Sequence, residues 1–82
     1  MGDEGPVGLI AGEGSFPLEV AAAVRSARRR AVVVALRGLT DPAIEARADA
    51  VSWLWLGELE RLLAVLREAG ARDVVMAGKV PK

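Results

Sequence analysis

The stretch VGLIAGEGSFPLEVAAAVRS, residues 7–26, decides the fold. Its first part, residues 7–11, is a short apolar run closed by Gly12, and its length and flanking glycines are typical of a buried strand. The alanine-rich residues 18–28 have high helix propensity. Pro17 lies in the first turn of this helix, where its missing N–H costs nothing. The stretch therefore predicts a buried strand, a tight turn and a helix.

The rest of the chain repeats this alternation. Apolar runs with the length of strands occupy residues 31–36, 51–56 and 73–77, and the second of these has the period of two expected near a sheet edge. A short helix is predicted for residues 43–48, after the helix-start signal Thr40-Asp41-Pro42. A longer helix between Gly57 and Gly70 shows one apolar face of four leucines: Leu59, Leu62, Leu63 and Leu66. Strands that alternate with helices predict an α/β fold, a Rossmann-like open parallel sheet of about four strands in the order 3-2-1-4.

Length and composition limit the chain to one small globular domain. We expect residues 1–6 to form a flexible start and residues 7–80 to form the domain.

Eleven basic and eleven acidic residues cancel, so the broad positive field of a nucleic-acid-binding protein is missing. Because cysteine and histidine are absent, disulfides, thiolate metal sites and Ser-His-Asp triads are excluded. No apolar run approaches the ~20 residues of a membrane span, and the acidic start is unlike a signal peptide.

The predicted topology places a candidate anion site at one edge of the sheet. Ligands of open parallel sheets bind beyond the carboxyl ends of the strands, where the strand order reverses, here between the first and fourth strands. That location brings the loop of Gly12, Gly14 and Ser15 beside the turn of Gly78 and Lys79. Amides at a helix N-terminus and an ammonium group suit a phosphate. The alternative stays open that the glycines only permit a tight turn, that Ser15 only caps the helix and that Lys79 is solvated.

Other polar and aromatic signals favour structural roles. Trp53 and Trp55 are interpreted as core or interface anchors rather than ligand contacts. The basic run 28–30 is interpreted as a partner of the helix dipole and a solvated face, with contact to anionic lipid as the weaker alternative. Glu13 and Asp41 share the predicted edge, although two carboxylates in separate loops are a weak metal signal.

A dinucleotide-dependent oxidoreductase is the competing class. The pair Gly12 and Gly14 matches the start of the Rossmann fingerprint, but Pro17 stands where the third glycine should be. The second strand ends at Arg37 rather than at the carboxylate that holds a ribose hydroxyl. Arg37 is compatible with a 2′-phosphate, so NADP stays a remote alternative.

Four phrases, taken in order, resemble the LpxI family. They are GLIAGEGSFP at residues 8–17, VVVALRG at 32–38, WLWLGEL at 53–59 and VVMAGKV at 74–80. Each phrase alone is common in α/β proteins, whereas the set and its spacing are specific. The resemblance covers nearly the whole chain from Val7 onward.

The resemblance implies a cytoplasmic enzyme of lipid A synthesis, peripheral at the inner membrane. The implied reaction is hydrolysis of UDP-2,3-diacylglucosamine to 2,3-diacylglucosamine 1-phosphate and UMP, with a divalent metal, Mg or Mn. Family members have a carboxyl-terminal domain with the catalytic aspartate and most of the metal chemistry, and nothing in this chain corresponds to it. We therefore expect the chain to be a fragment that is inactive alone, holds no metal alone and has that domain as its partner.

Matching residue by residue, the resemblance carries substrate contacts over to two segments only. These are the loop from Gly12 to Phe16 and the turn of Gly78 and Lys79, at an interdomain cleft that receives UDP-diacylglucosamine or its lipid product. Two alternatives stay open: a nucleotide- or phosphate-binding module of another enzyme, and a structural interaction domain. A homo-oligomer is compatible with each of these functions.

Overall fold

The computed structural model describes residues 5–80, so most of the flexible start predicted for residues 1–6 lies outside the described residues. The strands are β1 (Val7–Ala11), β2 (Ala31–Leu36), β3 (Ala50–Leu54) and β4 (Asp73–Ala77). The helices are α1 (Phe16–Ser26), the short 3-10 helix η1 (Pro42–Ala46) and α2 (Leu59–Glu68). All three strand pairs are parallel, and the sheet order is β3-β2-β1-β4. The predicted α/β class and strand order are confirmed.

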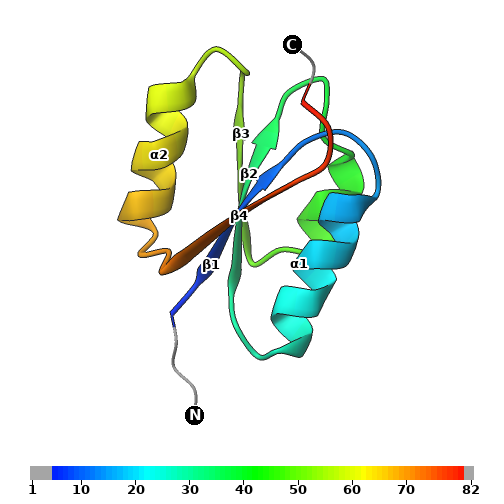
Figure 1. Cartoon of the computed structure of the whole chain (residues 1–82), viewed down its shortest axis with the longest axis vertical. Coiled ribbons are helices and arrows are strands. Elements are labelled where there is room, and N and C mark those ends of the chain that lie inside the picture. The colour runs from blue at the N-terminus through cyan, green and yellow to red at the C-terminus, as the bar shows by residue number, and fades with distance from the viewer. Residues whose placement is uncertain (1–4, 81–82) are drawn as a thin grey trace.

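Helices cover the sheet on both faces, with α1 and η1 on one side and α2 on the other (Figure 1). The core on the first side joins Ala21 of α1 and Ile44 of η1 to alternate positions of the strands, including Leu9 and Val33. The core on the α2 side contains Leu62 and Leu66 of α2 together with the remaining strand positions, Ile10, Val32, Val34 and Leu54. Because β1 and β2 are covered on both faces, every one of their residues is buried, which explains their nearly continuous apolar sequences.

Several predicted boundaries need correction. Helix α1 begins at Phe16, two residues before the predicted start, and ends at Ser26. The short helix spans Pro42–Ala46 and is a 3-10 helix, with the Asp41 side chain accepting a hydrogen bond from the Ala43 N–H at its start. Strand β3 lies at the sheet edge as expected but ends at Leu54, because the chain turns at this point. A prediction from apolar pattern alone therefore extended β3 too far.

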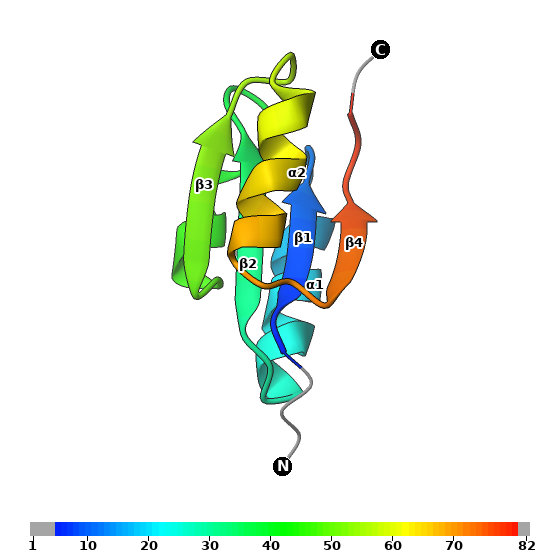
Figure 2. The ribbon, with the colours of Figure 1, turned by 90° about the vertical axis from the view of Figure 1, so that its left-hand side faces the viewer.

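Helix α2 shows a difference that matters for the surface of the molecule. Leu62 and Leu66 are buried as predicted, whereas Leu63 is 52% exposed. The helix packs mainly over β2 and β3, and Figure 2 shows β4 at the far edge of the sheet, beyond β1. The side of α2 that carries Leu63 borders a shallow groove beside Val74 of β4, so the predicted apolar face is only partly covered.

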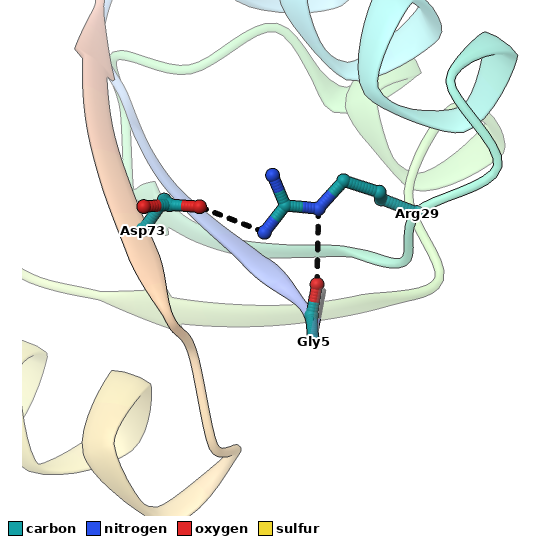
Figure 3. A network of polar contacts seen from close by, with 3 residues as sticks. All are labelled: Gly5, Arg29 and Asp73. Atoms are coloured by element: carbon teal, nitrogen blue, oxygen red, sulfur yellow. Dashed lines mark hydrogen bonds and ion pairs between the residues drawn. The ribbon is translucent and has the colours of Figure 1, made fainter. Parts of the chain in front are cut away.

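Arg29 ties the starts of two strands together at the amino-terminal edge of the sheet. Its Nε donates to the Gly5 carbonyl oxygen at 3.1 Å, and a terminal guanidinium nitrogen lies 2.8 Å from an Asp73 carboxylate oxygen (Figure 3). The expectation that the whole basic run 28–30 forms a solvated face is therefore wrong for Arg29. Its guanidinium instead links the connection after α1 to the start of β4.

Candidate functional site

The two glycine turns lie against each other at the carboxyl ends of β1 and β4. The Gly12 N–H donates to the Ala77 carbonyl oxygen at 2.8 Å, and the Glu13 N–H donates to the Lys79 carbonyl oxygen at 2.7 Å. The Lys79 N–H donates back to the Glu13 carbonyl oxygen at 3.2 Å, which makes a short antiparallel bridge beyond the parallel strands. The predicted meeting of these segments, far apart in the sequence, is therefore confirmed.

Close backbone approach explains two of the glycines. A Cβ atom on Gly12 would lie 2.5 Å from the Lys79 carbonyl oxygen, and one on Gly78 would lie 2.7 Å from the Glu13 carbonyl oxygen. Gly78 also has φ +94°, in the region that favours glycine. The structural reading of Gly12 and Gly78 thus holds: they let two loops touch.

Gly14 differs from these two glycines. It has φ +96°, and a Cβ atom built on it would meet nothing within 4 Å. The open space beside this residue adjoins the N-terminus of α1. Gly14 therefore leaves room for an outside group to approach the backbone.

Only part of the loop can offer amides to a ligand. The N–H groups of Gly12 and Glu13 already donate to the turn after β4, so Gly12 contributes through shape rather than as a donor. Within residues 5–80, the N–H groups of Gly14 and Ser15 have no hydrogen-bond acceptor. At the start of α1 the Phe16 N–H has no partner inside the helix and Pro17 has no N–H, whereas the Leu18 and Glu19 N–H groups donate to the Ser15 carbonyl oxygen. The available donors are thus the amides of residues 14–16.

Ser15 occupies the N-cap position, as predicted, but its side chain makes no capping hydrogen bond. Ser15 and the neighbouring Phe16 are exposed, while Pro17 is buried in the first turn of α1. The alternative that the Ser15 hydroxyl only caps the helix is therefore wrong. A hydroxyl and an aromatic ring instead face solvent beside the open space at Gly14.

Thr40 holds this loop in place, a role that the sequence pattern did not reveal. Its hydroxyl donates to the Ala11 carbonyl oxygen at 2.7 Å and accepts from the Leu36 N–H at 2.8 Å. The residue is only 6% exposed. Thr40 thereby connects the turn after β2 to the residue directly before Gly12. Its only signal in the sequence was its place in the helix-start motif before Pro42.

The charged groups along this edge do not form a metal site. The Asp41 carboxylate caps η1, and Glu13 stands in the neighbouring loop. Among residues 5–80, no group of three or more carboxylates is placed to hold a metal ion. Lys79 is exposed at the turn after β4. The arrangement therefore favours an anion over a cation.

The two tryptophans have different environments. Trp53 packs against the core on the α1 side, and its indole N–H donates to a Glu45 carboxylate oxygen at 2.6 Å, so its role as a packing anchor is confirmed. Trp55 is 62% exposed, and the Arg37 guanidinium lies 5.8 Å from its ring centre. A core position is therefore wrong for Trp55, whereas its role as an interface anchor stays a prediction. Arg37 itself is engaged with an aromatic ring at the end of β2.

None of the helices in the described residues is long and apolar enough to cross a membrane.

Residues 6–82 match the family model described as the LpxI N-terminal domain. The chain is also 34% identical over 76 residues to a protein of Caulobacter vibrioides named UDP-2,3-diacylglucosamine pyrophosphatase LpxI. That match covers 93% of this chain and 26% of the relative, so the chain spans about a quarter of that protein's length. On these matches, of which the family model includes the glycine loop and the turn after β4, the chain belongs to the LpxI family.

Proposed function

We propose that this chain is the substrate-holding part of a UDP-2,3-diacylglucosamine pyrophosphatase. The observation that carries the proposal is the direct contact between the Gly12 and Gly78 turns beside the N-terminus of α1. It joins unpaired amides, the exposed Ser15 hydroxyl and the Lys79 ammonium group at one edge of the sheet. Family membership supplies the substrate class, since the relative's name specifies a UDP-diacylglucosamine.

Each element of the site has a distinct task in this proposal. The amides of residues 14–16 and the helix dipole hold a pyrophosphate or sugar oxygen, with a contribution of about 0.3–1 kcal/mol from the helix end. Lys79 adds a mobile positive charge. Open space at Gly14 lets the substrate approach the backbone, and Phe16 offers an aromatic surface. Gly12 and Gly78 fix the distance between the two turns.

The chemical step needs groups that residues 5–80 do not provide. Water attacks one phosphorus of the pyrophosphate, the bridging P–O bond breaks, and the products are UMP and 2,3-diacylglucosamine 1-phosphate. Such a step needs charge neutralisation and an oriented water, commonly from a metal and carboxylates. The described residues do not fit a metal, since they contain no such carboxylate cluster. We therefore assign the metal, Mg or Mn, and the catalytic aspartate to a carboxyl-terminal domain, and the 82-residue chain to binding only.

The same proposal places the protein in the cytoplasm, against the inner membrane where a diacylated substrate resides. Titration of the 82-residue chain with UMP tests the binding role. We expect Lys79→Ala to weaken binding by about 1 kcal/mol, roughly fivefold in Kd. The control Arg30→Ala removes the same charge from an exposed residue at the opposite edge and should leave Kd unchanged.

Ser15→Ala provides a second arm of this experiment. Because the Ser15 side chain caps nothing, its removal should leave the unfolding midpoint in place and weaken UMP binding. Tighter binding of NADP than of UMP would favour a module of another enzyme. Absence of binding by UMP, NADP and the lipid product would favour a structural interaction domain. In the full-length enzyme, Gly14→Val should lower turnover or raise KM, and unchanged kinetics would reject the site.

A further inference from the structure

Strand β4 leaves apolar side chains uncovered on the face that it shares with α2. Gly8 and Ile10 of β1 are paired with Val74 and Met76, and Ile10 belongs to the core on the α2 side. Val74 and Met76 therefore lie on that face, where they are 52% and 68% exposed. On the opposite face of the same strand, Ala77 is buried in the core beneath α1. Val75, on the same side as Ala77, is 39% exposed, so β4 is less covered on the α2 side than on the α1 side.

The uncovered area continues onto α2. Leu63 is half exposed, and a shallow groove between α2 and β4 is lined by Leu63, Leu66, Arg67, Ala71 and Val74. We call Leu63, Val74 and Met76 the β4 face. In a small protein, a contiguous apolar surface beside a groove marks an interaction site more often than chance exposure does.

The outer edge of β4 is also open. Among the described strands, β4 pairs only with β1, whereas β1 is paired on both sides. Residues 74–77 include no charge and no proline, which are the usual devices that protect an edge from pairing. The edge of β4 is therefore suited to accept another strand.

The handedness of the crossovers predicts where the cover comes from. The connection from β1 to β2 runs through α1 and moves toward β3, whereas the connection from β3 to β4 runs through α2 on the other face and moves the opposite way (Figure 1, Figure 2). Crossovers between parallel strands are right-handed in about 98% of cases. A strand added beyond β4 must then be reached through a helix on the α2 side. Such a helix would lie directly on Val74 and Met76.

We propose that the β4 face is covered by a helix of the same polypeptide in the full-length protein, and that the strand after this helix pairs with the outer edge of β4. The inference rests on the proposed function in one respect, namely that the chain acts within a longer enzyme, and about three-quarters of the relative lies outside the match. A second copy fits the surface less well. Edge pairing of two β4 strands would place each copy's α2 over its own β2 and β3, and would leave Met76 uncovered.

Thiol labelling tests the proposal, since the 82 residues contain no cysteine. Met76→Cys is compared with the control Ala23→Cys, an exposed position on α1, in the 82-residue chain and in the longer gene product that contains it. In the 82-residue chain both thiols should react at similar rates. In the longer protein the thiol at position 76 should react more slowly by a factor of roughly ten or more, because labelling then needs local opening. The labelling rate of the control thiol at position 23 should be unchanged.

Three results would overturn the proposal: equal rates at position 76 in both proteins, a gene that ends at Lys82, or slow labelling of the 82-residue chain that is lost on dilution. The last result would identify a second copy as the cover. Val74→Cys repeats the measurement if the first variant does not fold by circular dichroism. The readout does not involve UMP, so a failed titration would reject the binding function without affecting this inference.

Discussion

Replacing Thr40 with valine should destabilise the protein strongly, although the two side chains have nearly the same shape. The Thr40 hydroxyl is the partner of both the Ala11 carbonyl and the Leu36 N–H, at 2.7 and 2.8 Å, and the residue is 6% exposed. Thr40→Val leaves both backbone groups buried without this partner. At about 1–3 kcal/mol for each of the two unsatisfied groups, the expected loss is about 2–6 kcal/mol. A domain of this length has a total stability of only roughly 4–12 kcal/mol.

Urea unfolding followed by circular dichroism measures this loss. With a slope near 1 kcal/mol per molar urea, the midpoint should fall by about 2 M or more. Thr40→Ser is the matched control, since it keeps the hydroxyl and loses one methyl group, at a cost of about 1 kcal/mol. A Thr40→Val midpoint equal to that of the wild type, or a Thr40→Ser loss as large as that of Thr40→Val, would refute the role of the hydroxyl.

Three further substitutions separate the other contacts. Gly78→Ala should cost at least about 1 kcal/mol more in unfolding free energy than Gly38→Ala. Both glycines have positive φ, but only the new Cβ atom at position 78 would lie 2.7 Å from a carbonyl oxygen, that of Glu13; equal losses would contradict the close approach. Asp73→Ala removes only an exposed ion pair worth about 0–1 kcal/mol. Arg29→Ala removes the same ion pair and also the donor to the Gly5 carbonyl oxygen, so it should destabilise the protein more; thermal unfolding at low and high salt checks this order. Trp55→Ala should change stability by less than about 1 kcal/mol while removing the solvent-exposed component of the fluorescence, and a larger loss would show that this ring is packed.

The central strands and the strand order could be predicted because the sequence carries their physical cause directly. Strands β1 and β2 are buried on both faces, so each is a continuous apolar run with no competing pattern. The end of β3 and the exposure of Leu63 could not be predicted in this way. Both depend on which part of the sheet lies beneath a residue, a long-range property that apolar spacing does not encode.

The site was predictable to the same degree. Gly12 and Gly78 had to share an edge once β1 and β4 were parallel neighbours, and they do. The bridge between Glu13 and Lys79, in which the N–H group of each residue is hydrogen-bonded, depends on the close approach of two backbone segments and has no sequence signature. Thr40 acts through a buried hydroxyl from a turn distant in sequence, and a threonine in that place reads equally well as part of a helix start.

The position of β4 couples the two surfaces that we have described. Its carboxyl end continues into Gly78 and Lys79 at the candidate site, and its outer edge and α2-side face are the uncovered ones. Among the strands of residues 5–80, β4 pairs with β1 alone, so it should open locally more often than the strands paired on both sides. A ligand that requires the turn after β4 in place binds with an apparent Kd raised by the reciprocal of the ordered fraction. Covering β4 in a longer protein should therefore strengthen UMP binding without adding a contact to UMP, and an equal Kd in both forms would show that the turn after β4 is already fully ordered.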